Sequence, residues 1–485
     1  MPIELLTFMI AEYLSTQDFG HLRLTSKHFS TLLFDAFGRE FFSKRQFMIS
    51  KHSLDTLTAI AHHEALAPYM THVIIGMEQF HNVINVGDSQ LGIWRNAWAG
   101  QWSLLNSGLL PTMLGHVFSS LPNLKTISIR DYSAPGRFRD RGKWHSYGTP
   151  TIVQDSQQTL MTPRPDAQSD YTGQLFSTII AALAQPDCTA RVPSIEVITR
   201  MPRIGMGDFG FHIAGIEWSF STAGSKNEGG IRGVIQGLEK LLLTLNLEAV
   251  SAPLPSMHAG PMEGFLATEN VVRFLGLATG LKHLRLNFET AHRDPAAAVN
   301  ARMIPALFEA LADANRFQLL FPNLSMLDVG MVMIDHYQLF KVIQRVAPTL
   351  KALSLYKVTF QYHSSQYHDE DDLPNPLQAF LKDISGINNL ALNRLDIGYT
   401  NQMNENRERF HIYFSTKSAF TNETERTGLA CFKGDMKEFL PKAIADVQVG
   451  WPVVVPAPDP TTPMNAPGTD PSNDDDSDDE DGDDE

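Results

Sequence analysis

The stretches FPNLSMLDV at residues 321–329 and APTLKALSL at residues 347–355 share one internal spacing. In each, a proline is followed two residues later by an apolar residue, three residues after that by a second, and two residues later by a third. The last two apolar positions alternate as they do in a half-buried β-strand, and the first seats the loop that leads into it. Each stretch therefore predicts a short strand with one apolar face.

The same phrase recurs along the chain from about residue 53. Two further copies keep the proline, APYMTHVII at 67–75 and LPNLKTISI at 121–129, and two lack it, TGLKHLRL at 279–286 and LALNRLDI at 390–397. Amphipathic helical patterns precede several copies, as in YQLFKVIQRVA at 337–347. A helix and a short strand that repeat together are typical of a leucine-rich repeat.

One repeat cannot bury its own apolar face, and stacked neighbours supply the missing core. We therefore predict an α/β fold in which residues 46–415 form one irregular leucine-rich-repeat-like solenoid. Polar insertions are expected near 133–170 and 361–376, and residues 416–452 are expected to cap the C-terminal end.

The charge of the chain is distributed unevenly. The 485 residues carry a formal net charge of −15, but residues 470–485 alone hold eleven acidic side chains and no Lys or Arg. Without this segment the net charge is −4, so the body is nearly neutral and has no basic footprint for nucleic acid. Composition predicts that residues 453–485 form a disordered acidic tail.

Cysteine content and hydropathy indicate the cellular compartment in which the protein is expected. Only Cys188 and Cys431 are present, which excludes a disulfide scaffold and a cysteine-rich zinc site. No apolar run reaches the length of about 18 residues that a membrane span needs, and the N-terminus lacks the basic region of a signal peptide. These features predict a cytoplasmic or nuclear protein without membrane contact.

No catalytic or cofactor motif stands out. Gly205, Gly207 and Gly210 match G-x-G-x-x-G, but a strand-like pattern follows them where a dinucleotide site needs a helix. The histidines at 62–63 and at 363 and 368 have no partners at metal-ligand spacing. We expect no cofactor, no metal and no catalytic residues.

The N-terminal stretch 2–29, PIELLTFMIAEYLSTQDFGHLRLTSKHF, is too apolar for a surface helix with a single buried stripe. Helices are predicted for residues 2–14, from Asp18 to Leu24, and from a cap at Thr25 or Ser26 through residue 42. Three helices in about forty residues are near the lower limit for independent folding, so this unit needs a packing partner.

This stretch resembles the F-box motif. The match runs through Pro2, Glu4, Leu5, Leu6, Ile10, Leu14, Asp18, Leu22, Leu24, Ser26, Lys27 and Phe29. The segment that follows is similar to the corresponding part of large fungal F-box families. Met1 stands where the motif usually has leucine, and Phe29 stands where a tryptophan is common.

The resemblance implies that residues 1–45 form an F-box, which binds the S-phase-kinase-associated adaptor of an SCF (cullin–RING) ubiquitin ligase and, through it, a cullin. The residues that the resemblance assigns to this contact are Pro2, Leu5, Leu6, Ile10, Leu14, Leu22 and Phe29. The alternative is a helical cap that only closes the first repeat, because repeat proteins require terminal caps.

With this resemblance, the sequence predicts a substrate-recognition subunit of an SCF-type ligase whose solenoid binds an unknown protein substrate. The alternative is a repeat scaffold for protein interactions outside any ligase. The residues between the buried strand positions face the other side of the sheet and are the substrate-binding candidates. They are Ser128, Arg130, His283, Arg285, Asp328, Ser354, Tyr356 and Asp396.

Overall fold

The computed structural model of this chain is a mixed α/β structure with a large, mostly parallel sheet. It describes residues 14–80, 89–132, 134–135, 143–156, 171–199, 216–217, 227–247, 262–288, 300–317, 320–362, 374–406, 408–417 and 424–452. Fourteen α-helices lie within these residues. Several predicted features lie outside the described residues. They are the predicted helix at 2–14 except for Leu14, the glycine motif, His363 and His368, and the predicted acidic tail.

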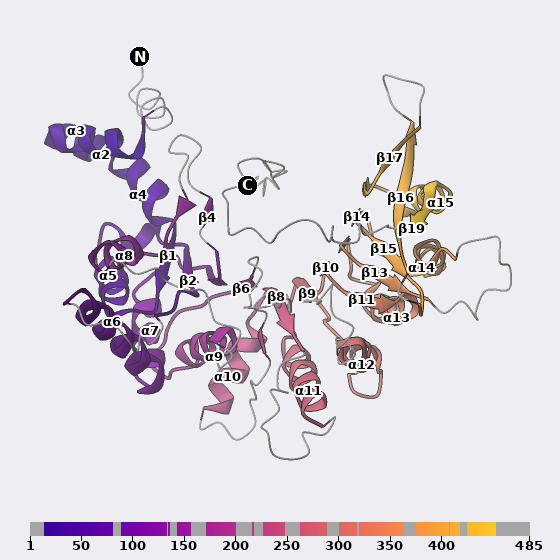
Figure 1. Cartoon of the computed structure of the whole chain (residues 1–485), viewed down its shortest axis with the longest axis horizontal. Helices are drawn as coiled ribbons and strands as arrows, with labels where there is room; N and C mark the ends of the chain where they lie inside the picture. Colours follow the sequence, from indigo (N-terminus) through magenta and orange to yellow (C-terminus); the bar gives the residue numbers. More distant parts are fainter. Residues whose placement is uncertain are drawn as a thin grey trace, which may run out of the picture.

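The main sheet follows the chain from one edge to the other. Its first nine strands in spatial order pair in parallel, each with the next, and β18 closes the row antiparallel to β14. Figure 1 shows the strands along the inside of an arc and the helices outside it. The strands are β1 (Lys44–Met48), β2 (His72–Gly76), β3 (Thr126–Arg130), β6 (Ser194–Ile198), β8 (Lys240–Asn246), β9 (His283–Phe288), β10 (Met326–Gly330), β12 (Ala352–Tyr356), β14 (Arg394–Gly398) and β18 (Leu429–Lys433), with β7 (Ile216–Glu217) beside β8.

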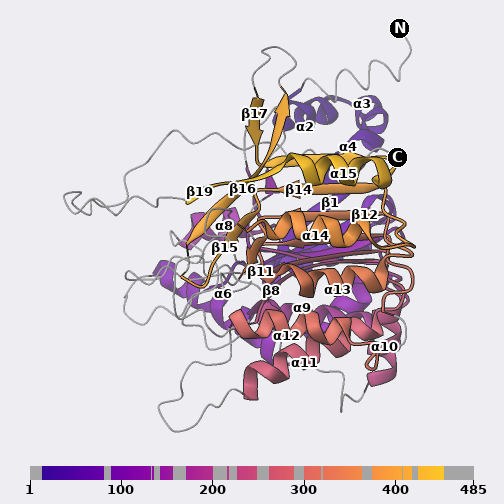
Figure 2. The same cartoon turned by 90° about the vertical axis from the view of Figure 1, so that its right-hand side faces the viewer.

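One layer of helices covers the outer face of the sheet. Neighbouring helices pack side by side, and Figure 2 shows α11 to α15 stacked in chain order. The layer contains α5 (Lys51–Ala61), α7 (Leu110–Ser119), α9 (Tyr171–Leu183), α10 (Glu228–Gln236), α11 (Met262–Leu277), α12 (Asn300–Ala312), α13 (His336–Val346), α14 (Pro376–Ser385) and α15 (Met436–Asp446), and a single 3-10 turn, η1 (Ala67–Tyr69), precedes β2. The amphipathic patterns at 109–121 and 337–347 correspond to α7 and α13, as predicted.

The repeated phrase forms the core as predicted. Leu324, Leu327 and Val329 are all buried on the helix side of β10, and each of the other five copies buries its three apolar positions in the same way. Two units escaped the sequence analysis: Val192, Ile195 and Val197 at β6, and Leu238, Leu241 and Leu243 at β8. The proline of the first, Pro193, follows the first apolar residue instead of preceding it by two, and the leucine run of the second conceals the alternation.

Backbone hydrogen bonds join each unit to the one before it. The amide of Ser325 donates to the carbonyl of Lys282 at 2.8 Å, and the amide of Lys351 donates to the carbonyl of Ser325 at 2.8 Å. Asn323 adds a side-chain bond from Nδ2 to the carbonyl of Thr279 at 3.0 Å. Because these bonds recur at equivalent positions, successive strands pair in register, with Leu327 beside Leu353.

A second sheet continues from the last repeats. Its parallel strands β11 (Met333–Asp335), β13 (Thr359–Gln361) and β15 (Asn401–Met403) each follow a main-sheet strand after a short turn. The antiparallel strands β16 (Arg409–Lys417), β17 (Thr424–Thr427) and β19 (Val447–Pro452) complete it. The expected boundary between solenoid and cap at residue 415 therefore falls inside β16.

The N-terminal helices are α2 (Thr16–Thr25), α3 (Lys27–Leu32) and α4 (Phe34–Phe42). Ser26 accepts a hydrogen bond from the amide of Phe29 and caps α3, as predicted, whereas Ser15 rather than Asp18 caps α2. The single helix predicted from Ser26 to residue 42 is wrong, because the chain turns at Leu33 and divides it into two helices.

The predicted insertion near 133–170 contains ordered elements among its described residues. These are the short strands β4 (Ala134–Pro135) and β5 (Lys143–Trp144) and the helix α8 (Thr149–Ser156). The amide of Tyr147 donates to the carbonyl of Gln46 at 2.8 Å, so this segment covers the free edge of β1. Helix α6 (Ser89–Asn106) packs beside α8 and buries Trp94 completely.

Gly280 tests how closely the repeats stack. A Cβ atom at this position would lie 2.5 Å from the carbonyl oxygen of Gln236 and 2.9 Å from that of Leu238, both in the preceding unit. Gly280→Ala should lower the free energy of unfolding by about 1–3 kcal/mol, because backbone atoms cannot yield as side chains do.

The control is Gly233→Ala on the exposed face of α10, where an added Cβ would meet nothing within 4 Å. It should raise the free energy of unfolding by about 0.5–1 kcal/mol through helix propensity. Urea unfolding followed by circular dichroism measures both values. Equal effects of the two substitutions would contradict the close approach of the units.

Candidate functional site

The inner face of the main sheet, opposite the helices, brings the predicted substrate-binding residues together. The in-register pairing forms one row across neighbouring strands, in which each residue lies beside the next. This row contains Ser128, Glu196, Leu242, Arg285, Asp328, Ser354 and Asp396. His283 lies in the adjacent row toward the strand starts, and Arg130 and Tyr356 lie in the row toward the strand ends.

Solvent access divides the inner face into two halves. From β3 to β8 most of its side chains are buried, apart from residues at the strand ends such as Lys240; Ser128 is 0 % exposed, Arg130 8 % and Glu196 6 %. From β9 to β14 the corresponding side chains are half-buried or exposed, and Tyr356 reaches 43 %. Of the predicted residues, all except Ser128 and Arg130 therefore lie in the half that a large ligand can reach.

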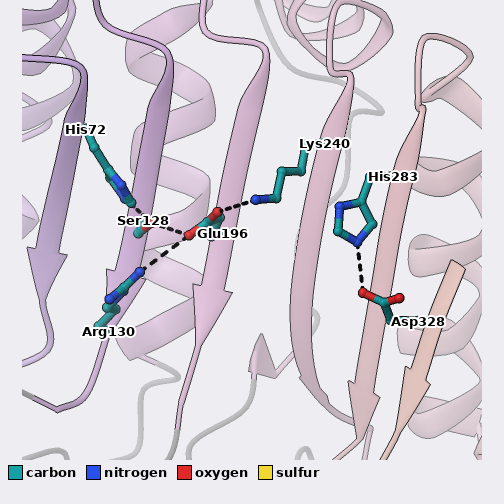
Figure 3. Close-up of polar contacts among 7 residues, drawn as sticks. All are labelled: His72, Ser128, Arg130, Glu196, Lys240, His283 and Asp328. Carbon is teal, nitrogen blue, oxygen red and sulfur yellow. Dashed lines mark hydrogen bonds and ion pairs between the residues drawn. The ribbon is translucent and has the colours of Figure 1, made fainter. Parts of the chain in front are cut away.

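Glu196 is the centre of a buried polar cluster (Figure 3). The hydroxyl of Ser128 donates to its Oε2 at 2.9 Å, and Nη2 of Arg130 lies 3.5 Å from the same oxygen. Nζ of Lys240 lies 3.1 Å from Oε1. A buried carboxylate needs such partners, because an unpaired charge in the interior is strongly destabilising. The sequence analysis missed Glu196 because its unit was not recognised.

The cluster fixes the charges of its members. Burial alone would raise the pKa of Glu196, but the charges of Lys240 and His72 and the hydrogen bonds from Lys240 and Ser128 outweigh it and lower the pKa to about 2. Burial lowers the pKa of His72 to about 3. At neutral pH, Glu196 is therefore ionised and His72 is uncharged.

The contact between His72 and Ser128 is not a nucleophile–base pair. His72 Nε2 lies 2.5 Å from Ser128 Oγ, whose proton is donated to Glu196. Neutral His72 therefore donates from Nε2 and has no free lone pair there to accept the serine proton. Because Ser128 is also fully buried, the three side chains form a hydrogen-bond chain that ties β2, β3 and β6 together.

The accessible half of the face carries separate polar pairs. His283 Nε2 lies 2.8 Å from Asp328 Oδ2, with about a fifth of each side chain exposed (Figure 3). Arg394 Nε lies 2.6 Å from Asp396 Oδ2. Burial and a hydrogen bond to Asp396 raise the pKa of the Cys431 thiol on the neighbouring strand. These pairs place hydrogen-bond donors and acceptors next to each other on the accessible half of the face.

A pocket of about 560 Å³ lies where the accessible half ends, at the carboxyl ends of β9 to β14. It is lined by Phe288, Met331, Lys357, Tyr399, Thr400, Asn401, Arg409, His411, Ile412, Tyr413 and Gly428. None of these residues was predicted, since they lie outside the repeated phrase, in turns, at the end of β9, at the start of β15 and in β16. The alternation in RFHIYF at 409–414 could have identified β16 as a strand. It could not have shown which segments of the chain lie opposite this strand.

The N-terminal helices hold the predicted adaptor contacts that the structure describes. Phe19, Leu33 and Phe41 form a small core of their own, and Leu14, Leu22 and Phe29 pack against it while remaining partly accessible. The guanidinium of Arg23 stacks over the Phe37 ring at 3.5 Å. Figure 1 shows α2 and α3 projecting beyond the end of the arc. Pro2, Leu5, Leu6 and Ile10 lie outside the described residues.

The side chain of Leu24 is an exposed apolar group on this helical unit. It is 85 % exposed and lies at the last turn of α2, on a different side from the buried Phe19. Leu22, two residues earlier, remains partly buried. The helical unit therefore uses one side for its own core and presents another to solvent.

Two searches of the described residues gave negative results. No helix within them is long and apolar enough to cross a membrane. No three or more His, Cys, Asp or Glu side chains in this part of the chain are grouped so that they could hold a metal ion.

Comparison with known proteins assigns no family. No family model matches the sequence, and no curated protein does. Among solved structures, the Rad7 and Elc1 complex in yeast contains a chain that is 13 % identical, with coverage of 77 % of this chain and 90 % of that one and a TM-score of 0.16. A TM-score this low defines neither a shared fold nor a shared function.

The buried cluster predicts a specific pH dependence. The pKa of His72 is about 3 in the folded state and 6.5 without the protein environment, so between these values the unfolded chain binds more protons. Stability is therefore fully present above pH 6.5 and falls as the pH drops, by roughly 2–3 kcal/mol at pH 4.5. Below pH 4.5, Glu196 adds a second loss, since its pKa is also depressed.

His72→Gln should remove the His72 part of this loss, because the amide can still donate to Ser128 but does not titrate. Urea unfolding at several pH values from 4.5 to 7.5 measures the difference between wild type and variant. The control is His62→Gln at the exposed end of α5. Parallel curves for wild type and His72→Gln would show that the pKa of His72 is the same in the folded and the unfolded chain, and would contradict its lowering by burial.

Proposed function

We propose that this chain is a substrate-recruiting subunit of an SCF-type ubiquitin ligase. In this proposal residues 1–45 are an F-box, and the repeated units form a leucine-rich-repeat-like body that binds the substrate. The F-box would dock on the S-phase-kinase-associated adaptor and, through it, on a cullin. The chain itself would supply no catalytic group.

The observation that carries this proposal is the separation of the N-terminal helices from the body. Their core of Phe19, Leu33 and Phe41 is distinct from the main core, although Phe42 packs against both and α4 contacts Tyr69 of the body. A helical unit that merely closed the first repeat would direct its apolar side chains at the sheet. Instead, Leu24 is exposed, and the motif positions Leu22 and Phe29 are partly accessible.

The accessible half of the inner face supports a role in substrate binding. It combines an exposed aromatic side chain, Tyr356, with charged side chains of both signs, a composition typical of protein interfaces. A substrate held there would be brought close to a ubiquitin-conjugating enzyme in the same assembly. The mechanism is an increase in effective concentration, which accelerates transfer without a new chemical group.

A direct binding experiment tests the adaptor contact. Leu24→Asp should weaken binding of the full chain to the purified S-phase-kinase-associated adaptor by about tenfold or more, because a charge replaces an apolar side chain at the interface. Ile10→Asp, in the motif itself, should have the same effect. Leu109→Asp is the control, since Leu109 is 62 % exposed but lies at the start of α7.

Isothermal titration calorimetry gives the dissociation constants. If the wild-type chain and the adaptor do not associate at micromolar concentrations, the ligase proposal fails and the interaction scaffold takes its place. If Leu109→Asp weakens binding as much as Leu24→Asp does, the helical unit is not the docking site.

A second experiment tests the inner face. The triple variant Arg285→Ala, Tyr356→Ala, Asp396→Ala should lose about tenfold or more of substrate recovery while adaptor binding stays unchanged. The matched control, Arg232→Ala, Tyr337→Ala, Glu438→Ala, removes the same kinds of exposed side chain from the outer helices. Quantitative mass spectrometry after affinity purification under proteasome inhibition measures recovery. Equal profiles for both triple variants would exclude the inner face as the binding surface.

A further inference from the structure

In three consecutive units, the residue directly after the main-sheet strand has an unusual backbone conformation. Met331, Lys357 and Tyr399 each follow the last residue of a main-sheet strand and have φ values of 51°, 54° and 51°. This left-handed conformation is costly for residues other than glycine and persists only where the surrounding structure fixes it. Their amides donate to the next unit, Met331 to the carbonyl of Tyr356 at 2.9 Å and Lys357 to that of Gly398 at 2.8 Å.

These turn residues form one wall of the pocket of about 560 Å³, which we call the rim pocket. The facing wall is β16, whose alternate side chains Arg409, His411 and Tyr413 line the cavity, while Phe410 and Phe414 are buried on its other side. A volume of this size is typical of ligand sites. Lys357, Arg409 and His411 can carry positive charge, and no described acidic side chain lines the pocket.

Polar atoms in the rim pocket lack partners. Arg409 Nε and Thr400 Oγ1 are shielded from solvent, and neither makes a hydrogen bond with a described residue. Thr400 is 1 % exposed and Asn401, whose Oδ1 is also unpaired, is 4 % exposed. Burial lowers the pKa of Arg409. Buried donors and a cation without partners cost free energy, and an anionic group in the pocket would satisfy them.

The chain itself contains a matching anion. Residues 470–485 carry eleven acidic side chains and no basic one. The described chain ends at Pro452, which pairs with Phe410 next to Arg409 in the pocket wall. The intervening residues 453–469 include five prolines, and a segment of this length spans roughly 20–50 Å, according to how extended it is. Such a tether gives a local concentration of about millimolar.

We infer that the rim pocket is a carboxylate-binding site for an acidic peptide, and that its occupant is the C-terminal segment 470–485 of the same chain. Carboxylates of this segment accept hydrogen bonds from Arg409 and Thr400 and pair with the ammonium group of Lys357. Because the pocket adjoins Tyr356 and the accessible half of the inner face, an external acidic ligand must displace this segment to bind there. The inference does not depend on adaptor binding.

Zero-length carbodiimide cross-linking of the full chain tests this contact, since it couples a lysine amine to a carboxylate that touches it. Peptide mass spectrometry should find Lys357 joined to residues 470–485 about tenfold more often than Lys351, an exposed lysine that precedes the same strand. Lys357→Arg keeps the charge and should abolish the cross-link. Equal yields at Lys357 and Lys351 would overturn the inference.

Arg409→Gln should lower the Lys357 cross-link by about tenfold, because charge-assisted hydrogen bonds are lost. The matched control is Arg426→Gln, which removes one charge from β17, where Arg426 lies over the Tyr413 ring at 4.8 Å but does not line the pocket. This control should leave the yield unchanged. Equal losses in both variants would show general electrostatic attraction instead of a site. The melting temperature of each variant verifies that it is folded.

Discussion

Backbone hydrogen bonding between successive units is the constraint on which the rest of the structure depends. Each strand must pair with the strand before it, and the loops that enter the strands bond in the same order, as Ser325 does with Lys282. A shift of one residue would turn every apolar side chain away from the helices. The core therefore fixes the register, and the register in turn aligns the polar residues of the inner face.

The same alignment has different consequences in the two halves of the face. Between β3 and β8 it places Glu196 among Ser128, Arg130 and Lys240, where burial requires that every charge be paired. This cluster holds strands together and is closed to a large ligand. From β9 to β14 the aligned pairs remain accessible, so the second half of the arc is the part of the inner face that a large ligand can reach.

The second sheet adds a feature that the repeats alone would not have. Left-handed residues at the ends of β10, β12 and β14 redirect the chain into it, and β16 then faces these turns across the rim pocket. Arg409 Nε and Thr400 Oγ1, which have no hydrogen-bond partner among the described residues, lie there. Unsatisfied polar groups in a cavity call for a partner, such as water, an ion or a ligand.

The sequence by itself determined the repeated strand, its buried positions and the face on which His283, Arg285, Asp328 and Asp396 lie, because strand alternation and apolar spacing are local properties. It also indicated the capping of α3 by Ser26. Only the tertiary structure decided that Arg130 is buried in a charge cluster and that Lys357 and Arg409 share a pocket. These facts depend on which segments meet across many residues, and neither periodicity nor composition contains that information. The unit at β6 was missed for a related reason, since its proline is displaced although its packing is the same.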